Sequence, residues 1–219
     1  MTYSILARDP ETGAFGGAAA TGSLCVGGWV LRGRAGVGIS ASQGASPSTL
    51  WGEEALVRLA SGDSAHATVT ALTGMDAGRD FRQLSVLGPD DAAAFTGTSN
   101  TPHTADMVFD TGVAAGNLLA SDDVVAATVE AFRTGMGSFA ERLLAALFAG
   151  QSAGSDKRGL LSAALLVVSR HHAPLTLRVD YNEDPVRALA ALHERATSGD
   201  YAFWARQVPT LAEPERALD

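Results

Sequence analysis

The sequence predicts an α+β fold: a four-layer αββα sandwich in which two antiparallel sheets pack together and helices cover both outer faces. Strand patterns are joined by tight turns, and hairpin connections of this kind produce antiparallel sheets. Helical patterns come in pairs between groups of strands, which indicates separate helical layers. The run from Leu160 to Ser169 is almost continuously apolar, as expected for a strand buried on both faces.

The chain opens with a predicted β-hairpin. Residues 2–8 and 14–21 resemble strands, and residues 9–13 (DPETG) contain the Pro and Gly that tight turns use. We expect the hairpin to begin at the first residue, with no secretory leader before it. Thr2 follows Met1, so removal of Met1 would leave a hydroxyl residue with a free amine at the start of the chain.

The remaining elements follow from hydrophobic periodicity, caps and glycine stops. Residues 22–30 are apolar and rich in glycine, which is typical of either a loop or an irregular strand. Residues 97–110 are polar and predict the longest surface loop. Predicted strands cover 33–42, 81–87, 92–96, 112–118, 160–169 and 175–180, and predicted helices begin near 47, 64, 121, 138 and 184.

The chain shows no internal linker. Residues 1–208 are therefore predicted to form one domain. Residues 209–219 are acidic and interrupted by proline, which predicts a poorly ordered C-terminal tail.

Composition narrows the classes of partner. The net charge is −8 and no basic stripe exists, which argues against nucleic acid and against anionic membrane surfaces. No run approaches the roughly 20 apolar residues that span a bilayer. Cys25 is the only cysteine, so an intrachain disulfide is excluded, and its apolar surroundings indicate an inert buried thiol. We expect a cytoplasmic protein that binds a small molecule.

Most familiar catalytic motifs are missing. There is no Gly-x-Ser-x-Gly elbow, and the five histidines lack metal-ligand spacing with carboxylates or Cys25, so we expect neither a metal nor a cofactor. An N-terminal Thr needs neither, because its own α-amine, with a pKa of roughly 7.7–8, serves as the base. Thr2 is the predicted nucleophile, although it could equally be an ordinary β-branched residue at a strand start. Ser4 is the next hydroxyl on the same face, but it cannot own a free amine.

Other polar residues suit a substrate site. Ser42 and Gln43 end a predicted strand before a helix, where they could line a cleft. Asn117 could hold an oxyanion or satisfy a buried backbone group. Asp156 and Arg158 are also candidates for substrate binding: Arg158 could bind an anionic substrate group bidentately, or it could simply pair with Asp156.

Several segments, in order along nearly the whole chain, carry a family resemblance. They are residues 2–13, 35–38, 82–84, 96–97, 116–117, 141–147, 153–159 and 177–180. Together they are similar to the bacterial family called domain of unknown function 1028 (DUF1028). That family is grouped by fold with the N-terminal nucleophile (Ntn) hydrolases, so the resemblance implies the αββα sandwich, and fold analogy adds a possible homo-oligomer.

The sequence departs from the family pattern at a few positions. Leu160 and Leu161 stand where an Arg-Gln pair is typical, Ser155 replaces a Gly, and Tyr181-Asn182 replace an acidic residue and His. If those polar groups form the family's site wall, this member has a more apolar pocket, a different substrate or no activity.

Two functions remain open at this point. The first is an Ntn-type hydrolase that cleaves an amide bond in a small molecule with Thr2. The second is a non-catalytic small-molecule-binding or scaffold protein that retains the Ntn fold.

Overall fold

The fold is described from a computed structural model of the chain, which covers residues 2–100, 103–121, 123–154 and 159–218. The strands are β1 (Thr2–Arg8), β2 (Phe15–Thr21), β3 (Leu31–Arg34), β4 (Gly38–Gly44), β5 (Arg82–Leu87), β6 (Ala92–Thr96), β7 (Ala105–Phe109), β8 (Gly112–Asn117), β9 (Ser162–Val168) and β10 (Leu175–Val179). The helices are α1 (Val26–Trp29), α2 (Thr49–Ala60), α3 (Ala65–Gly74), α4 (Asp123–Thr134), α5 (Phe139–Ser152), α6 (Pro185–Ala196) and α7 (Gly199–Ala205), with a 3₁₀ turn at Arg79–Phe81.

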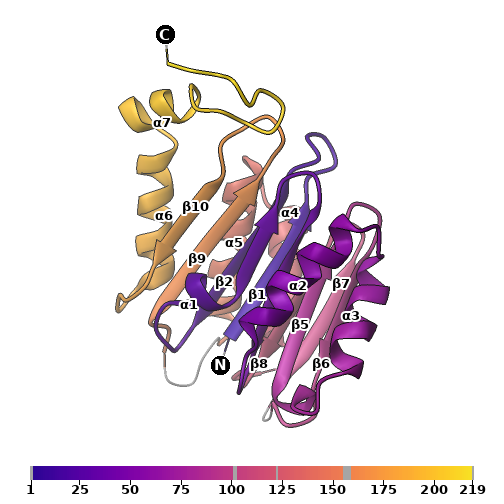
Figure 1. Cartoon of the computed structure of the whole chain (residues 1–219). Helices are drawn as coiled ribbons and strands as arrows, with labels where there is room; N and C mark the ends of the chain where they lie inside the picture. The colour runs from indigo at the N-terminus through magenta and orange to yellow at the C-terminus, as the bar shows by residue number, and fades with distance from the viewer. Residues whose placement is uncertain (1, 101–102, 122, 155–158, 219) are drawn as a thin grey trace.

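These elements form two antiparallel sheets with helices outside both. The larger sheet has the order β10-β9-β2-β1-β8-β7 and the smaller one β3-β4-β5-β6. Helices α2 and α3 cover the outer face of the smaller sheet, and α4 and α5 cover the far face of the larger sheet (Figure 1). The predicted αββα sandwich is confirmed. No helix among the described residues is long and apolar enough to cross a membrane.

Strand β1 lies in the middle of the larger sheet, between β2 and β8. Its side chains alternate between two cores. Tyr3 and Ile5 pack in the core beneath α4 and α5, whereas Leu6 packs in the core between the sheets. The Tyr3 hydroxyl donates to the Leu147 carbonyl of α5 at 2.7 Å, and burial raises the pKa of the Tyr3 phenol. Strand β1 is therefore fixed from both faces.

Small residues allow the layers to approach closely. A Cβ at Gly17 of β2 would lie 2.9 Å from Leu6 Cδ2 and 3.0 Å from Ile39 Cδ1, in the interface between the sheets. A Cβ at Gly150 of α5 would lie 2.5 Å from Tyr3 Cε2 on the opposite face of the larger sheet. The many Gly and Ala residues of the sequence thus serve close packing.

Several local predictions are confirmed in detail. The capping box at the start of α5 is present: Ser138 N–H donates to Glu141 Oε2 at 2.7 Å, and Glu141 N–H donates to Ser138 Oγ at 3.3 Å. These hydrogen bonds hold the pKa of the Glu141 carboxyl below its usual value. The almost continuously apolar run contains β9, which lies between β2 and β10 as an interior strand of the larger sheet.

Three predicted segments are corrected. Residues 97–110, expected as a loop, contain β7, which pairs with β8 as an edge strand and leaves Met107 and Val108 exposed. An exposed edge strand lacks the apolar alternation that identifies buried strands. Residues 33–42, expected as one strand, lie in the hairpin of β3 and β4. Residues 22–30, expected as a loop or an irregular strand, contain the short helix α1.

The C-terminal region also differs from the prediction. Helix α7 was not expected, and residues 209–218 make specific contacts instead of fraying. Ala212 N–H donates to the Arg170 carbonyl at 2.8 Å, Thr210 N–H donates to the Glu213 carbonyl at 3.1 Å, and the Thr210 side chain is buried. The Ala212 bond holds the tail against the loop that follows β9, and the Thr210 bond forms a turn within the tail.

We expect Gly150→Ala to lower the free energy of unfolding by at least about 2 kcal/mol, because the new methyl group overlaps the Tyr3 ring. Gly74→Ala, at the exposed end of α3 where a Cβ meets nothing within 4 Å, is the matched control and should change stability by less than about 1 kcal/mol. Urea denaturation followed by circular dichroism measures both. Equal stability of the two variants would contradict the close packing of α5 on β1.

Candidate functional site

A cavity of about 270 Å³ opens at the end of the sandwich where β1 begins. We call it the Thr2 cavity. Its wall combines hydroxyl and amide groups from the strands with apolar side chains from residues 24–30 and 45–47. The lining residues are Thr2, Thr21, Ser23, Leu24, Val26, Trp29, Val30, Gln43, Gly44, Ala45 and Pro47.

Thr2 reaches this cavity because of the hairpin register. Residues of β1 and β2 pair so that Thr2 lies opposite Thr21, and the Thr2 hydroxyl hydrogen-bonds the Thr21 hydroxyl at 3.1 Å. On its other side, β8 places Asn117 opposite Thr2. Residues directly opposite in antiparallel strands share a sheet face, so all three side chains point toward the smaller sheet.

Buried amides join the two sheets beneath the cavity. Gln43 of β4 donates from Nε2 to Gln83 Oε1 at 2.6 Å and to the Thr2 carbonyl at 3.4 Å. Its Oε1 accepts from the Ser4 hydroxyl at 2.8 Å. Gln83 of β5 in turn donates to the Gly116 carbonyl at 3.0 Å. Satisfied polar networks of this kind fix geometry in a low-dielectric interior, so they hold the start of β1 in place.

Asn117 extends the same network. It is fully buried, and its Nδ2 donates to Gln83 Oε1 at 3.2 Å. Its Oδ1 is a buried acceptor without a hydrogen-bond partner among residues 2–100, 103–121, 123–154 and 159–218. The Asn117 amide therefore supports the sheet interface and is not among the cavity-lining residues.

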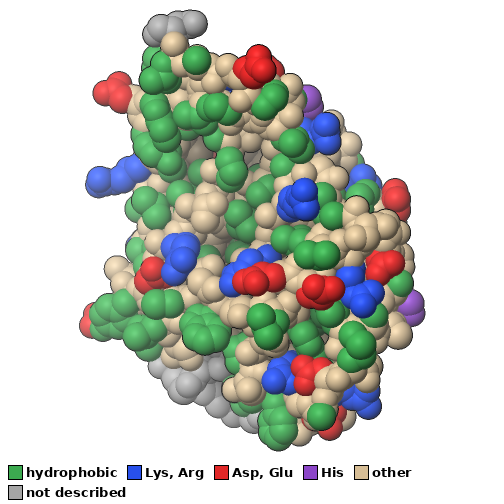
Figure 2. All heavy atoms as spheres, in the orientation of Figure 1, with side chains coloured by type: hydrophobic (Ala, Val, Ile, Leu, Met, Phe, Trp, Pro, Cys, Tyr) green, Lys and Arg blue, Asp and Glu red, His purple; other side chains and the backbone are tan. Residues whose placement is uncertain are grey.

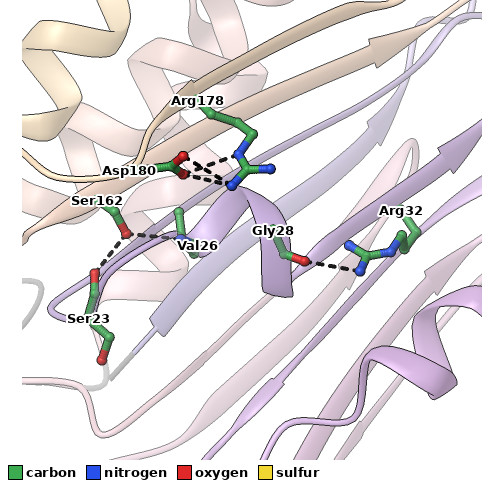
Figure 3. Close-up of polar contacts among 7 residues, drawn as sticks. All are labelled: Ser23, Val26, Gly28, Arg32, Ser162, Arg178 and Asp180. Carbon is green, nitrogen blue, oxygen red and sulfur yellow. Dashed lines mark hydrogen bonds and ion pairs between the residues drawn. The ribbon is translucent and has the colours of Figure 1, made fainter.

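Residues 22–30 form the outer wall of the cavity and are held by side chains of neighbouring strands (Figure 3). The Ser162 hydroxyl of β9 accepts from Val26 N–H at 3.1 Å and donates to the Ser23 carbonyl at 2.8 Å. Arg32 of β3 donates to the Gly28 carbonyl at 3.0 Å. Arg178 of β10 packs on the wall at Gly27, where an added Cβ would lie 2.6 Å from Arg178 Cγ.

A family model described as "Family of unknown function (DUF1028)" matches residues 2–189. The chain belongs to the DUF1028 family. Its fold is similar to the crystal structure of protein SPO2555 from Silicibacter pomeroyi, also assigned to DUF1028, with 53% sequence identity and a TM-score of 0.96. The match covers 100% of this chain and 96% of that chain. No curated protein matches.

In this DUF1028 protein, the predicted site residues fall into three groups. Thr2 and Gln43 line the cavity. Ser4 and Asn117 lie beneath it, buried in the amide network.

Of the remaining predicted residues, Ser42 is not among the residues that line the cavity. Strand alternation turns Ser42 to the opposite face of β4, where its hydroxyl donates to the Ser48 carbonyl at the start of α2, at 2.7 Å. Asp156 and Arg158 lie outside the described residues. No group of three or more His, Cys, Asp or Glu side chains that could hold a metal ion is found in the described part of the chain.

Sequence reasoning missed Thr21, Ser23 and Gln83. The hairpin offered a partial signal for Thr21, because a turn near residues 9–13 brings the far end of the second strand close to Thr2. The observed register, with Arg8 opposite Phe15, then pairs Thr2 with Thr21. Gln83 lies opposite Gln43 across β4 and β5, a pairing that depends on which strands become neighbours. No local pattern reveals that choice.

We expect Gln43→Leu to lower the free energy of unfolding by about 2 kcal/mol or more, because it leaves the buried Ser4 hydroxyl without its acceptor and removes a donor from Gln83. Gln207→Leu is a suitable control, since the half-buried Gln207 side chain has no hydrogen bond among the described residues. Thermal unfolding compares the two, and a Gln43→Leu variant as stable as the control would refute the bridging role.

Proposed function

We propose that this DUF1028 protein is an Ntn-type hydrolase that cleaves an amide bond in a small molecule, with Thr2 as the nucleophile after Met1 is removed. The observation that carries the proposal is the half-buried Thr2 hydroxyl in the wall of the cavity, 3.1 Å from the Thr21 hydroxyl. A cytoplasmic location, a small-molecule substrate and a homo-oligomeric state accompany it as predictions.

The cavity residues favour this chemistry over others. None of them is His, Lys, Asp or Glu, so the lining within the described chain supplies no side-chain base. The α-amine of an N-terminal Thr2 would supply one, with a pKa near neutrality at roughly 7.7–8. A nucleophile and its base would then belong to one residue, at one end of a strand fixed by its neighbours.

The reaction would proceed in two steps, acylation of Thr2 and hydrolysis of the resulting ester. Thr2 Oγ1 attacks the substrate carbonyl carbon while its proton passes to the α-amine and then to the leaving amine, which departs as the C–N bond breaks. Water then attacks the resulting ester, with the α-amine taking its proton and returning it to Oγ1. The products are a carboxylic acid, a free amine and the original Thr2 hydroxyl.

The oxyanion that forms on the substrate carbonyl needs hydrogen-bond donors other than the Asn117 side chain. Asn117 is buried and its N–H₂ group is engaged by Gln83, while Gln43 is engaged by Gln83 and by backbone carbonyls. Either amide would have to abandon a buried partner in order to serve substrate. Backbone N–H groups around the cavity are the better candidates for this role.

The engagement of the Gln43 and Asn117 amides in buried hydrogen bonds favours a second candidate function. If Met1 stays attached, the Thr2 nitrogen is a peptide amide, and the described lining of the cavity supplies no base. The cavity would then bind a small neutral molecule without turning it over. The state of the Met1–Thr2 bond separates the two functions.

The first experiment determines the N-terminus of the protein purified from its native host. Trypsin cleaves after Arg8, so the first peptide is either TYSILAR or MTYSILAR. We expect TYSILAR to dominate in the mass spectrum. Complete retention of Met1 in the native protein would eliminate the Thr2 mechanism.

The second experiment tests the nucleophile directly with an acylating β-lactone probe on protein that begins at Thr2. We expect an ester adduct on Thr2, located by fragmentation of the first tryptic peptide. Thr2→Ala should slow labelling by at least about 100-fold, since catalytic groups contribute factors on the order of 10² to 10⁴. Thr2→Ser should keep the adduct.

Ser4→Ala is the matched control, because Ser4 lies in the same peptide and on the same sheet face. Its labelling should fall far less than that of Thr2→Ala, because it removes one hydrogen bond to Gln43 and leaves the Thr2 hydroxyl and amine present. Labelling that survives Thr2→Ala but disappears in Ser4→Ala would reassign the nucleophile.

A further inference from the structure

We infer that the Thr2 cavity selects an uncharged, apolar group, with Leu24 and Trp29 as the side chains that determine this specificity. That this group is the acyl part of a substrate amide rests on the proposed function. The preference itself depends only on the cavity.

The cavity lining contains two chemically different kinds of side chain. Thr2, Thr21 and Ser23 contribute hydroxyl groups. The apolar side chains are more numerous: Leu24, Val26, Trp29, Val30, Ala45 and Pro47. Leu24 and Trp29 remain 54% and 52% exposed, so a bound apolar group would remove part of their surface from water.

Charged groups near the wall are already engaged. Arg178 donates to both carboxylate oxygens of Asp180, at 2.9 and 3.1 Å, and α1 lies between this pair and Arg32 (Figure 3). Arg32 donates to two backbone carbonyls and lies 3.6 Å from Glu53.

The surface around α1 and α2 shows the same arrangement, with several acidic and basic side chains adjacent to one another (Figure 2). A charged ligand group would therefore enter a cavity whose described side chains offer it no opposite charge, and above about pH 9 a terminal α-amine at residue 2 is uncharged as well. Burial of an unpaired charge is costly, and the cavity should reject it.

The apolar wall is preformed. Cys25 N–H donates to the Asp180 carbonyl at 3.0 Å, and the Val30 carbonyl accepts from Ser42 N–H at 3.1 Å. With the Ser162 and Arg32 bonds already described, these contacts use several backbone groups of residues 22–30 and leave the apolar side chains to meet a ligand. A rigid wall loses little conformational entropy when a ligand binds.

The volume of the cavity limits the size of the group that it can bind. Sites for drug-sized ligands usually measure about 300–1,000 Å³. At about 270 Å³ the Thr2 cavity suits one short apolar group rather than a whole large ligand. A hexanoyl chain is a suitable probe.

The test compares two probes that differ only at the end of the chain: hexanoyl anilide and adipoyl monoanilide, which carries a terminal carboxylate. Binding is measured by calorimetry at about pH 9 on the Thr2→Ala variant, so no turnover interferes and the terminal amine carries no charge. We expect the hexanoyl probe to bind at least about tenfold more tightly, because the carboxylate finds no partner. Equal binding, tighter binding of the adipoyl probe or no binding of either would overturn the inference.

Variants of the wall identify the residues responsible. Trp29→Ala should weaken hexanoyl binding by about tenfold, as expected for truncation of a Trp anchor, and Trp29→Phe should weaken it less. Trp204→Ala is the matched control, because Trp204 is 48% exposed on α7 and does not line the cavity. Leu24→Arg should shift the preference toward the adipoyl probe. An unchanged preference in Leu24→Arg, or equal losses in Trp29→Ala and Trp204→Ala, would contradict the assignment.

The two proposals fail separately. Selective hexanoyl binding without a Thr2 adduct would retain this inference and remove the hydrolase. A Thr2 adduct without selectivity between the probes would support the hydrolase and overturn this inference.

Discussion

The hydrogen bond between Gln43 and Gln83, at 2.6 Å, is the interaction on which the architecture of the site depends. The interface between the sheets is otherwise filled by apolar side chains such as Leu6 and Ile39. At the end near the cavity, however, amides replace them and connect β4 and β5 to the backbones of β1 and β8. A buried amide without partners costs about 1–3 kcal/mol, so these groups strongly favour one arrangement of the sheets. That arrangement brings the start of β1 to an opening rather than into the core.

The fold was predictable to the extent that its signals are local. The first hairpin, the Ser138–Glu141 capping box and the apolar strand β9 all combine residues close in sequence, and each is present. Helix α1 could not be predicted because four residues containing two glycines have little helix propensity. Ser162, Arg32 and Arg178 come from distant strands and hold it in place.

The residues of the candidate site were likewise predictable only where their signals are local. Thr2 could be predicted because it follows Met1, and Gln43 because it lies near a strand end, where polar groups can meet solvent. The alternation along β4 explains why Ser42, one residue earlier, faces α2 instead. Asn117 was identified as a polar residue in an apolar strand, and its burial against Gln83 favours the structural reading offered beside the catalytic one. Membership of DUF1028 and likeness to protein SPO2555 support the fold and leave the chemistry to be argued from these residues.

Cys25 gives the wall of the cavity a practical use. It is the only cysteine of the chain, it is partly exposed, and it adopts a left-handed backbone conformation with φ 61° at the start of α1, next to Leu24. A fluorophore or spin label attached to this thiol would sit beside the cavity without any change to the sequence. Natural protein could thus carry a spectroscopic reporter of cavity occupancy, and compound libraries could be screened for ligands before any reaction is known.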